Sequence, residues 1–197
     1  MTIWKLLLVP FLSIFLCTSF SVKANTTRDI FAKYPNEYFI ETGSFMGEGI
    51  RMALEAGFEK IYSIEISPHY YEHCKQRFAS YPGVTIIQGD SAYILGELLK
   101  RIDGPATFWL DGHYSCVAMA GKGETNTPLL AELESIRQHP VKTHTILIDD
   151  IRLLATEHLD YLTLDQITKK ILEINPNYQI TFEDGVIAND VLVAFIP

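Results

Sequence analysis

The stretch YQITFEDGVIANDVLVAFI, residues 178–196, settles the topology of the chain because it holds two short apolar segments with no helix between them. The segments at 178–183 and 191–196 contain the β-branched and aromatic residues that are typical of strands. The connection at 184–190 is shorter than the roughly one dozen residues that a parallel crossover needs. The sequence therefore predicts a C-terminal antiparallel hairpin.

Upstream of the hairpin, short apolar runs alternate with longer stretches in which apolar residues recur three or four positions apart. The runs predict strands at 38–41, 60–65, 85–88, 106–111 and 145–149. The longer stretches predict helices at 48–56, 69–81, 92–101, 128–139 and 164–175. This alternation predicts an α/β chain with a Rossmann-like, doubly wound sheet that is mostly parallel and ends in the antiparallel hairpin.

Length and charge narrow the class of partner. A chain of 197 residues with 48% hydrophobic residues suits one globular domain with a sizeable core. The net charge is −8 at pH 7 and no basic run occurs, so a nucleic-acid partner is not expected. A small-molecule partner fits this composition better.

Residues 1–24 have the pattern of a secretory signal peptide. Lys5 precedes an apolar run at 6–17, which is shorter than the roughly 20 residues that span a bilayer. Small residues at Val22 and Ala24 predict cleavage before Asn25 and a secreted or periplasmic location. The alternative is an uncleaved anchor that leaves the domain on the membrane or in the cytoplasm, and membrane contact is expected only through this segment.

Cleavage would leave two cysteines, Cys74 on a predicted helix and Cys116 in a predicted loop. A disulfide between them is one reading of this pair. Two free thiols are favoured because the two residues are expected on different parts of the sheet.

The segment FIETGSFMGEGI at 39–50 runs from a strand ending in Glu41 through Gly43 and Gly47 into a helix. Phe45 stands where the dinucleotide motif G-x-G-x-x-G has its second glycine. The resulting E-x-G-x-x-x-G, together with five predicted strands separated by helices and a terminal antiparallel hairpin, resembles class I S-adenosylmethionine-dependent methyltransferases. The resemblance assigns Glu41, Gly43 and Gly47 to the cofactor, and the alternative is an ordinary strand-to-helix turn.

Two further strand ends carry polar side chains at the positions expected for that cofactor. Glu65 follows Gly43 by 22 residues, where doubly wound folds hold ribose hydroxyls with a carboxylate. Asp90 and Ser91 follow the next strand, and the resemblance implies that they contact adenine. Each of these residues alone could be a turn residue, because Asp and Ser are common after strands.

Acidic residues end the last two parallel strands as well, with Asp111 after one and Asp149 and Asp150 after the other. Carboxylates gathered at one sheet edge repel, and their hard oxygens suit Mg²⁺ or another divalent cation. The arrangement resembles that of metal-dependent O-methyltransferases of the catechol and macrocin types, which implies that these three residues hold the metal. The alternative is that Asp149 and Asp150 cap a turn and Asp111 is solvated.

The general base departs from the catechol-type pattern, in which a lysine follows the first metal-binding acid by three residues. Tyr114 stands at that position, so His113 is the nearest candidate base, with Lys122 and Tyr114 as substitutes. The long polar loop at 115–127 is expected to be a lid over the acceptor pocket or a disordered segment.

Together these features predict a methyltransferase-like domain at 25–197 that transfers a methyl group from S-adenosylmethionine to a small hydroxylated acceptor. The predicted signal peptide conflicts with this function, because the cofactor is made inside cells. The alternative is an exported, non-catalytic Rossmann-like protein that binds a nucleoside, a metal or a partner protein.

Overall fold

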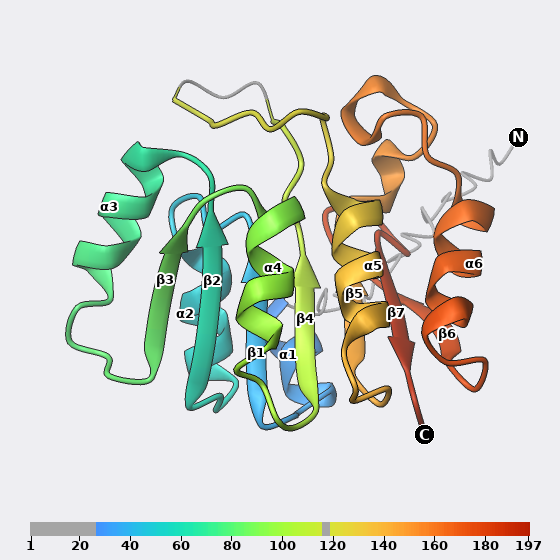
Figure 1. Ribbon diagram of the computed structural model, residues 1–197, viewed down its shortest axis with the longest axis horizontal. Helices are drawn as coiled ribbons and strands as arrows, with labels where there is room; N and C mark the ends of the chain where they lie inside the picture. Colours follow the sequence, from blue (N-terminus) through green and yellow to red (C-terminus); the bar gives the residue numbers. More distant parts are fainter. Residues whose placement is uncertain (1–26, 116–118) are drawn as a thin grey trace, which may run out of the picture.

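In the computed structural model, which describes residues 27–115 and 119–197, seven strands form one sheet in the order β3-β2-β1-β4-β5-β7-β6 (Figure 1). The predicted signal region at 1–24 and Cys116 lie outside the described residues. The strands are β1 Tyr38–Thr42, β2 Lys60–Glu65, β3 Val84–Gln88, β4 Ala106–Leu110, β5 Thr145–Ile148, β6 Gln179–Glu183 and β7 Val191–Phe195.

Neighbouring strands from β3 to β5 are parallel, whereas β7 is antiparallel to both β5 and β6. The C-terminal hairpin and the mostly parallel sheet are therefore confirmed. Because β7 inserts between β5 and β6, the start of β7 lies beside the carboxyl end of β5.

The helices are α1 Thr27–Lys33, α2 Glu48–Glu55, α3 Pro68–Arg77, α4 Ser91–Leu99, α5 Leu129–Gln138 and α6 Leu164–Ile174, with short 3-10 turns η1 Ile151–Leu153 and η2 Glu157–Leu159. All five predicted helices are present, and α1 is an additional helix. The prediction carried α3 four residues too far, to Tyr81. The helix ends at Arg77 with Phe78 as its C-cap, and Pro82 disfavours a helical conformation only at Tyr81.

Two hydrophobic layers pack on the sheet, one on each face. Helices α4, α5 and α6 cover the face that is in front in Figure 1, and α1, α2 and α3 pack against the other. All residues of β1 and β4 are buried, as expected for central strands covered on both sides. Among the residues that the structure describes, none of the helices has the length and apolar character needed to cross a membrane.

The loops that follow β1 to β5 leave the sheet at one edge, which is the upper edge in Figure 1. Backbone hydrogen bonds continue the sheet pattern into these loops: Gly43 N donates to Ile64 O, and Asp111 N donates to Thr42 O. Gly43 and Asp111, the first residues after β1 and β4, are therefore held by backbone hydrogen bonds to neighbouring strands. This edge is where open α/β sheets bind ligands.

Candidate functional site

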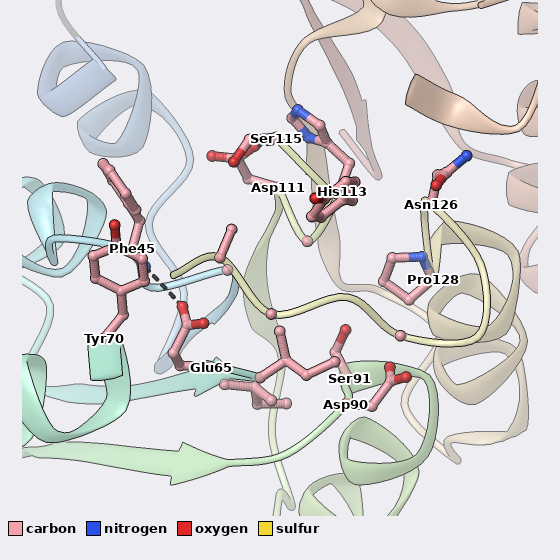
Figure 2. A pocket seen from close by; sticks show the side chains of 18 of the residues that line it. Phe45, Glu65, Tyr70, Asp90, Ser91, Asp111, His113, Ser115, Asn126 and Pro128 are labelled. Carbon is pink, nitrogen blue, oxygen red and sulfur yellow. Dashed lines mark hydrogen bonds and ion pairs between the residues drawn. The ribbon is translucent and has the colours of Figure 1, made fainter. Parts of the chain in front are cut away.

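A cavity of about 260 Å³ lies at this edge, lined by residues that follow β1 to β5 (Figure 2). Seven of the predicted site residues line it: Gly43, Glu65, Asp90, Ser91, Asp111, His113 and Asp150. Three do not: Glu41, Gly47 and Asp149. The predicted constellation therefore converges on one cavity in large part, with specific exceptions.

Gly43 makes the turn between β1 and the cavity. Its φ of 86° lies in the left-handed region that favours glycine. A β-carbon there would also lie 2.6 Å from the backbone oxygen of Asp111. Glycine thus lets the loops after β1 and β4 meet beside the cavity.

Glu65 fixes two loops at the cavity wall. One carboxylate oxygen accepts a hydrogen bond from Phe45 N at 2.8 Å, and the other accepts one from Ser67 N at 2.7 Å. Each oxygen has a further lone pair, so the buried carboxylate retains capacity to accept hydrogen bonds from a ligand. The same residue can therefore order the loop after β1 and bind vicinal hydroxyls.

Phe45 also lines the cavity, and the sequence did not predict it as a site residue. It adopts a left-handed backbone conformation with φ of 45° and is 46% exposed. Its ring packs on Tyr70 with centroids 4.6 Å apart, and Figure 2 shows the pair beside Glu65. Tyr70 belongs to α3, so no local sequence signal links the two aromatic residues.

Asp90 and Ser91 lie at the start of α4 and have different hydrogen-bond partners. Asp90 caps the helix by accepting a hydrogen bond from Ala92 N at 2.9 Å. The Ser91 hydroxyl donates to Glu132 at 2.6 Å. Burial raises the pKa of Glu132 to about 7, although the Ser91 hydrogen bond opposes this shift. Asp90 thus serves as a turn residue and lines the cavity at the same time.

Glu41 is buried behind the loop rather than at the cavity. Ser63 donates a short hydrogen bond to it, and Ser44 and Ser63 share a hydrogen bond of 2.5 Å. A β-carbon on Gly49 would collide with the Glu41 carboxylate. Burial, with the charges of Asp111 and Glu65, raises the pKa of Glu41 to about 8 against the lowering effect of Ser63. Glu41 is therefore mostly protonated at neutral pH.

Gly47 also lies away from the cavity lining. A β-carbon there would lie 2.5 Å from the ring of Phe78 and 3.2 Å from the sulfur of Cys74. Both residues belong to α3 or its end, so this glycine allows α2 to pack closely on α3. Of the three defining residues of the E-x-G-x-x-x-G motif, Gly43 lines the cavity, whereas Glu41 and Gly47 support it from behind.

At the other end of the cavity, His113 lies between two carboxylates. Its Nδ1 is 3.4 Å from an Asp111 oxygen, and its Nε2 is 3.3 Å from an Asp150 oxygen. Burial alone would lower the pKa of His113, but Asp111, Asp150 and Asp149 outweigh it and raise the pKa above its usual value. Asp150 itself has a left-handed backbone conformation, with φ of 58°, in the turn after β5.

The three predicted metal ligands do not form one group. The ligand atoms that approach within 4.8 Å of one another belong to two sets in the described part of the chain: Asp111, His113 and Asp150, and Asp149, Asp150 and Asp190. Burial and the charges of Asp111, Asp150 and Asp190 raise the pKa of Asp149 to about 8. Asp149 thus belongs to the second set, whereas His113 lies beside Asp111 in the first.

Arg152 and Asp190 complete this cluster and were not predicted. The Arg152 guanidinium pairs closely with both Asp150 and Asp190, and Asp190 is fully buried. Asp190 immediately precedes β7, and the pairing of β7 with β5 places Asp190 at this edge of the sheet. The sequence predicted the hairpin but not its insertion beside β5.

The substitute bases differ in their positions. Tyr114 lines the cavity, whereas Lys122 is exposed and its Nζ lies 5.1 Å from the centre of the Tyr114 ring. Of these three candidate bases, His113 is the one that directly contacts carboxylates of the cavity.

No protein-family model and no curated protein sequence matches this chain. Solved structures do resemble it. A methyltransferase from Podospora anserina bound to S-adenosylhomocysteine has a TM-score of 0.57 and 12% identity, with 87% of this chain and 76% of that chain covered. An O-methyltransferase from Bacillus cereus in complex with S-adenosylhomocysteine has a TM-score of 0.57 and 12% identity, over 87% and 79%.

The N-methyltransferase NodS from Bradyrhizobium japonicum is similar as well, with a TM-score of 0.52 and 10% identity over 83% of this chain and 86% of that one. The likeness thus extends to proteins whose names give different acceptor atoms. At such low identity it establishes the fold alone. This chain has the class I methyltransferase fold.

Proposed function

We propose that this protein is an S-adenosylmethionine-dependent methyltransferase that acts on a small hydroxylated acceptor. The observation that carries the proposal is a single cavity with two chemically distinct ends. Glu65 and Asp90 line one end, and His113 with Asp111 and Asp150 lines the other. The first end suits a nucleoside, and the second suits a group that must lose a proton.

The cofactor end offers acceptors for the hydroxyls and amino group of an adenosine. Glu65 would accept hydrogen bonds from the ribose hydroxyls while its two backbone contacts keep it in place. Asp90 and Ser91 would border adenine. Gly43, which lines the cavity where the loops after β1 and β4 meet, would border the remainder of the cofactor, and the methyl group would be transferred beside Asp111 and His113.

Transfer requires an acceptor oxygen to attack the methyl carbon while the carbon–sulfur bond breaks and its electron pair goes to sulfur. In this proposal the hydroxyl proton goes to neutral His113. One neighbouring carboxylate orients the imidazole, and the other stabilises the imidazolium that forms. The rest of the rate enhancement comes from alignment of the two reactants.

A second version of the mechanism uses a divalent cation such as Mg²⁺. The ligand atoms of Asp111, His113 and Asp150 lie close enough together to share one divalent cation. The two carboxylates are oxygen ligands of the kind Mg²⁺ prefers, whereas the His113 imidazole suits a transition metal such as Zn²⁺ or Fe²⁺ better. The cation would supply a positive charge that makes the acceptor hydroxyl more acidic. In this version His113 is a ligand rather than the base, so the two versions differ in their sensitivity to chelators.

Glu65→Ala should weaken binding of S-adenosylhomocysteine by roughly ten- to a hundredfold, because it removes a charge-assisted hydrogen bond worth about 1.5–3 kcal/mol. Calorimetric titration of residues 25–197 measures this change. Glu72→Ala is the matched control, because Glu72 is an exposed acid of α3 outside the cavity lining.

Unchanged affinity in Glu65→Ala would exclude the proposed role of this carboxylate. If the wild-type domain ignores both S-adenosylmethionine and S-adenosylhomocysteine at millimolar concentration, the enzyme proposal fails. Binding of adenosine without the sulfur compounds would favour the non-catalytic, nucleoside-binding alternative instead.

We also propose that the chain is exported after cleavage before Asn25. The support is the short apolar run at 6–17 followed by Val22 and Ala24. Mass spectrometry of the protein from its native host should then find Asn25 as the first residue. A full-length chain recovered from the membrane fraction would contradict cleavage and support an N-terminal anchor.

A further inference from the structure

Residues 119–126, which we call the roof, cross the cavity on their way from β4 to α5. Figure 1 shows this segment in yellow above the sheet edge, and Figure 2 shows the chain passing over the cavity. Ala120, Gly121, Gly123, Thr125 and Asn126 are the roof residues that line the cavity. The roof has no helix or strand of its own, so its position depends on the contacts it makes.

The contacts in the first half of the roof are with the loops after β2 and β3. Ser67 Oγ donates a hydrogen bond of 2.6 Å to Met119 O. Gly121 packs on Ile66 and on the backbone of Ser67, and Gly123 packs on the carboxylate of Asp90. These neighbours follow Glu65 or begin the Asp90–Ser91 turn, so this half covers the cofactor end of the cavity.

The second half of the roof is tied elsewhere. Tyr114 N donates to Asn126 O at 2.7 Å, and Asn126 Nδ2 donates to Glu157 O at 2.9 Å. Just beyond, Thr127 N donates to Asp160 at 3.0 Å. The roof therefore joins the loops after β2 and β3 to the segment after β5.

Both glycines of the roof lie where there is no room for a side chain. A β-carbon on Gly121 would lie 2.5 Å from Ile66 and 3.0 Å from Ser67 N, and one on Gly123 would collide with Asp90. Neither glycine has a φ in the left-handed region, so alanine is compatible with the backbone angles at both positions. Alanine at position 121 would push the roof away from the Ile66–Ser67 backbone, and alanine at position 123 would displace the roof or the Asp90 carboxylate that it meets. Lys122, between them, is exposed.

We propose that the roof is the adenosine-side wall of the cofactor site, and that Gly121 and Gly123 are positioning residues that let it close. This inference rests on the proposed function. The sequence predicted a lid over the acceptor pocket in this loop. The contacts of the first half of the roof are instead with the residues around Glu65 and Asp90, so we assign it to the cofactor. A wall here excludes water from the nucleoside and slows its escape.

The test compares Gly121→Ala and Gly123→Ala with Lys122→Ala, a matched change to alanine in the same segment. Dissociation rates of S-adenosylhomocysteine and adenosine are measured by surface plasmon resonance. Each glycine variant should release both ligands about tenfold faster, because overpacking displaces the wall. The lysine variant should stay within about twofold of wild type.

Hydrogen exchange provides a readout that does not depend on affinity. Amides at 119–126 should become protected when wild type binds S-adenosylhomocysteine, and less so in Gly123→Ala. Wild-type binding with unchanged dissociation in both glycine variants, or with no added protection of the roof, would overturn this inference and leave the proposed function standing. Failure of wild type to bind either ligand would overturn both.

Discussion

Replacing His113 with alanine should lower the rate of methyl transfer by about two to four orders of magnitude, the usual contribution of general acid–base catalysis. His113 contacts both Asp111 and Asp150 at one end of the cavity, away from Glu65 and Asp90. Affinity for S-adenosylhomocysteine should therefore stay within about twofold of wild type. The measurement is S-adenosylhomocysteine formation at saturating cofactor with a panel of small diols and catechols.

The control for this substitution is His158→Ala, because His158 is exposed and lies outside the cavity lining. Excess chelator separates the two versions of the mechanism. Chelator should leave wild-type turnover unchanged if His113 acts as the base without a metal, and should reduce it to the level of His113→Ala if a cation is required. Wild-type turnover in His113→Ala would contradict both versions.

Acidification from pH 7 to pH 4 should destabilise the protein through a buried histidine pair at the opposite end of the sheet. Ala106 N donates to His144 Nδ1 at 3.0 Å, so this nitrogen carries no proton. His144 Nε2 then donates to His139 Nδ1 at 2.9 Å, and His139 Nε2 donates to Ile102 O at 2.9 Å. The chain of hydrogen bonds is complete when both rings are neutral.

Burial, with electrostatic repulsion from the neighbouring His139 and Lys142, lowers the pKa of His144 from its ordinary value of about 6.5 to about 4. Above pH 6.5 neither the folded nor the unfolded state binds this proton, so the stabilisation is fully present. Between pH 6.5 and pH 4 only the unfolded state takes up the proton, and stability falls. The total loss should be on the order of 3 kcal/mol.

Urea unfolding at pH values between 7 and 4 measures this loss as the slope of unfolding free energy against pH. His144→Gln removes the titrating ring but keeps a donor and an acceptor, so its slope should be flatter than that of wild type. His158→Gln is the control and should keep the wild-type slope. Equal slopes for wild type and His144→Gln would show that His144 is not held neutral in the folded protein.

For most strands and helices, the sequence predicts where the element begins and ends to within two residues. Central strands such as β1 and β4 are buried on both faces, which produces short continuous apolar runs between polar turns. The end of α3 was mispredicted because the apolar spacing continues to Tyr81, whereas the helix ends at Arg77 with Phe78 as its C-cap. Local signals compete at such ends, and spacing alone does not resolve them.

The convergence of Glu65, Asp90, Asp111 and Asp150 on one cavity was predictable because parallel strands end at the same edge of a sheet. The position of Glu41 away from the cavity was not read from its motif. It lies two residues after Phe39, so strand alternation directs it to the face packed by α2, where it contacts Gly49. The motif predicted that the loop after β1 belongs to the site, whereas the alternation of side chains along β1 predicts the face toward which Glu41 points.

The residue pattern establishes the order of the elements, the C-terminal hairpin and the edge of the sheet at which the polar loops gather. These features follow from periodicity and connection length, which are local properties of a chain. Packing alone brings His113 between Asp111 and Asp150, Arg152 to Asp190, and the roof onto the loops after β2 and β3. Loop side chains have no period, so their partners are set by whichever distant backbone the folded sheet brings beside them.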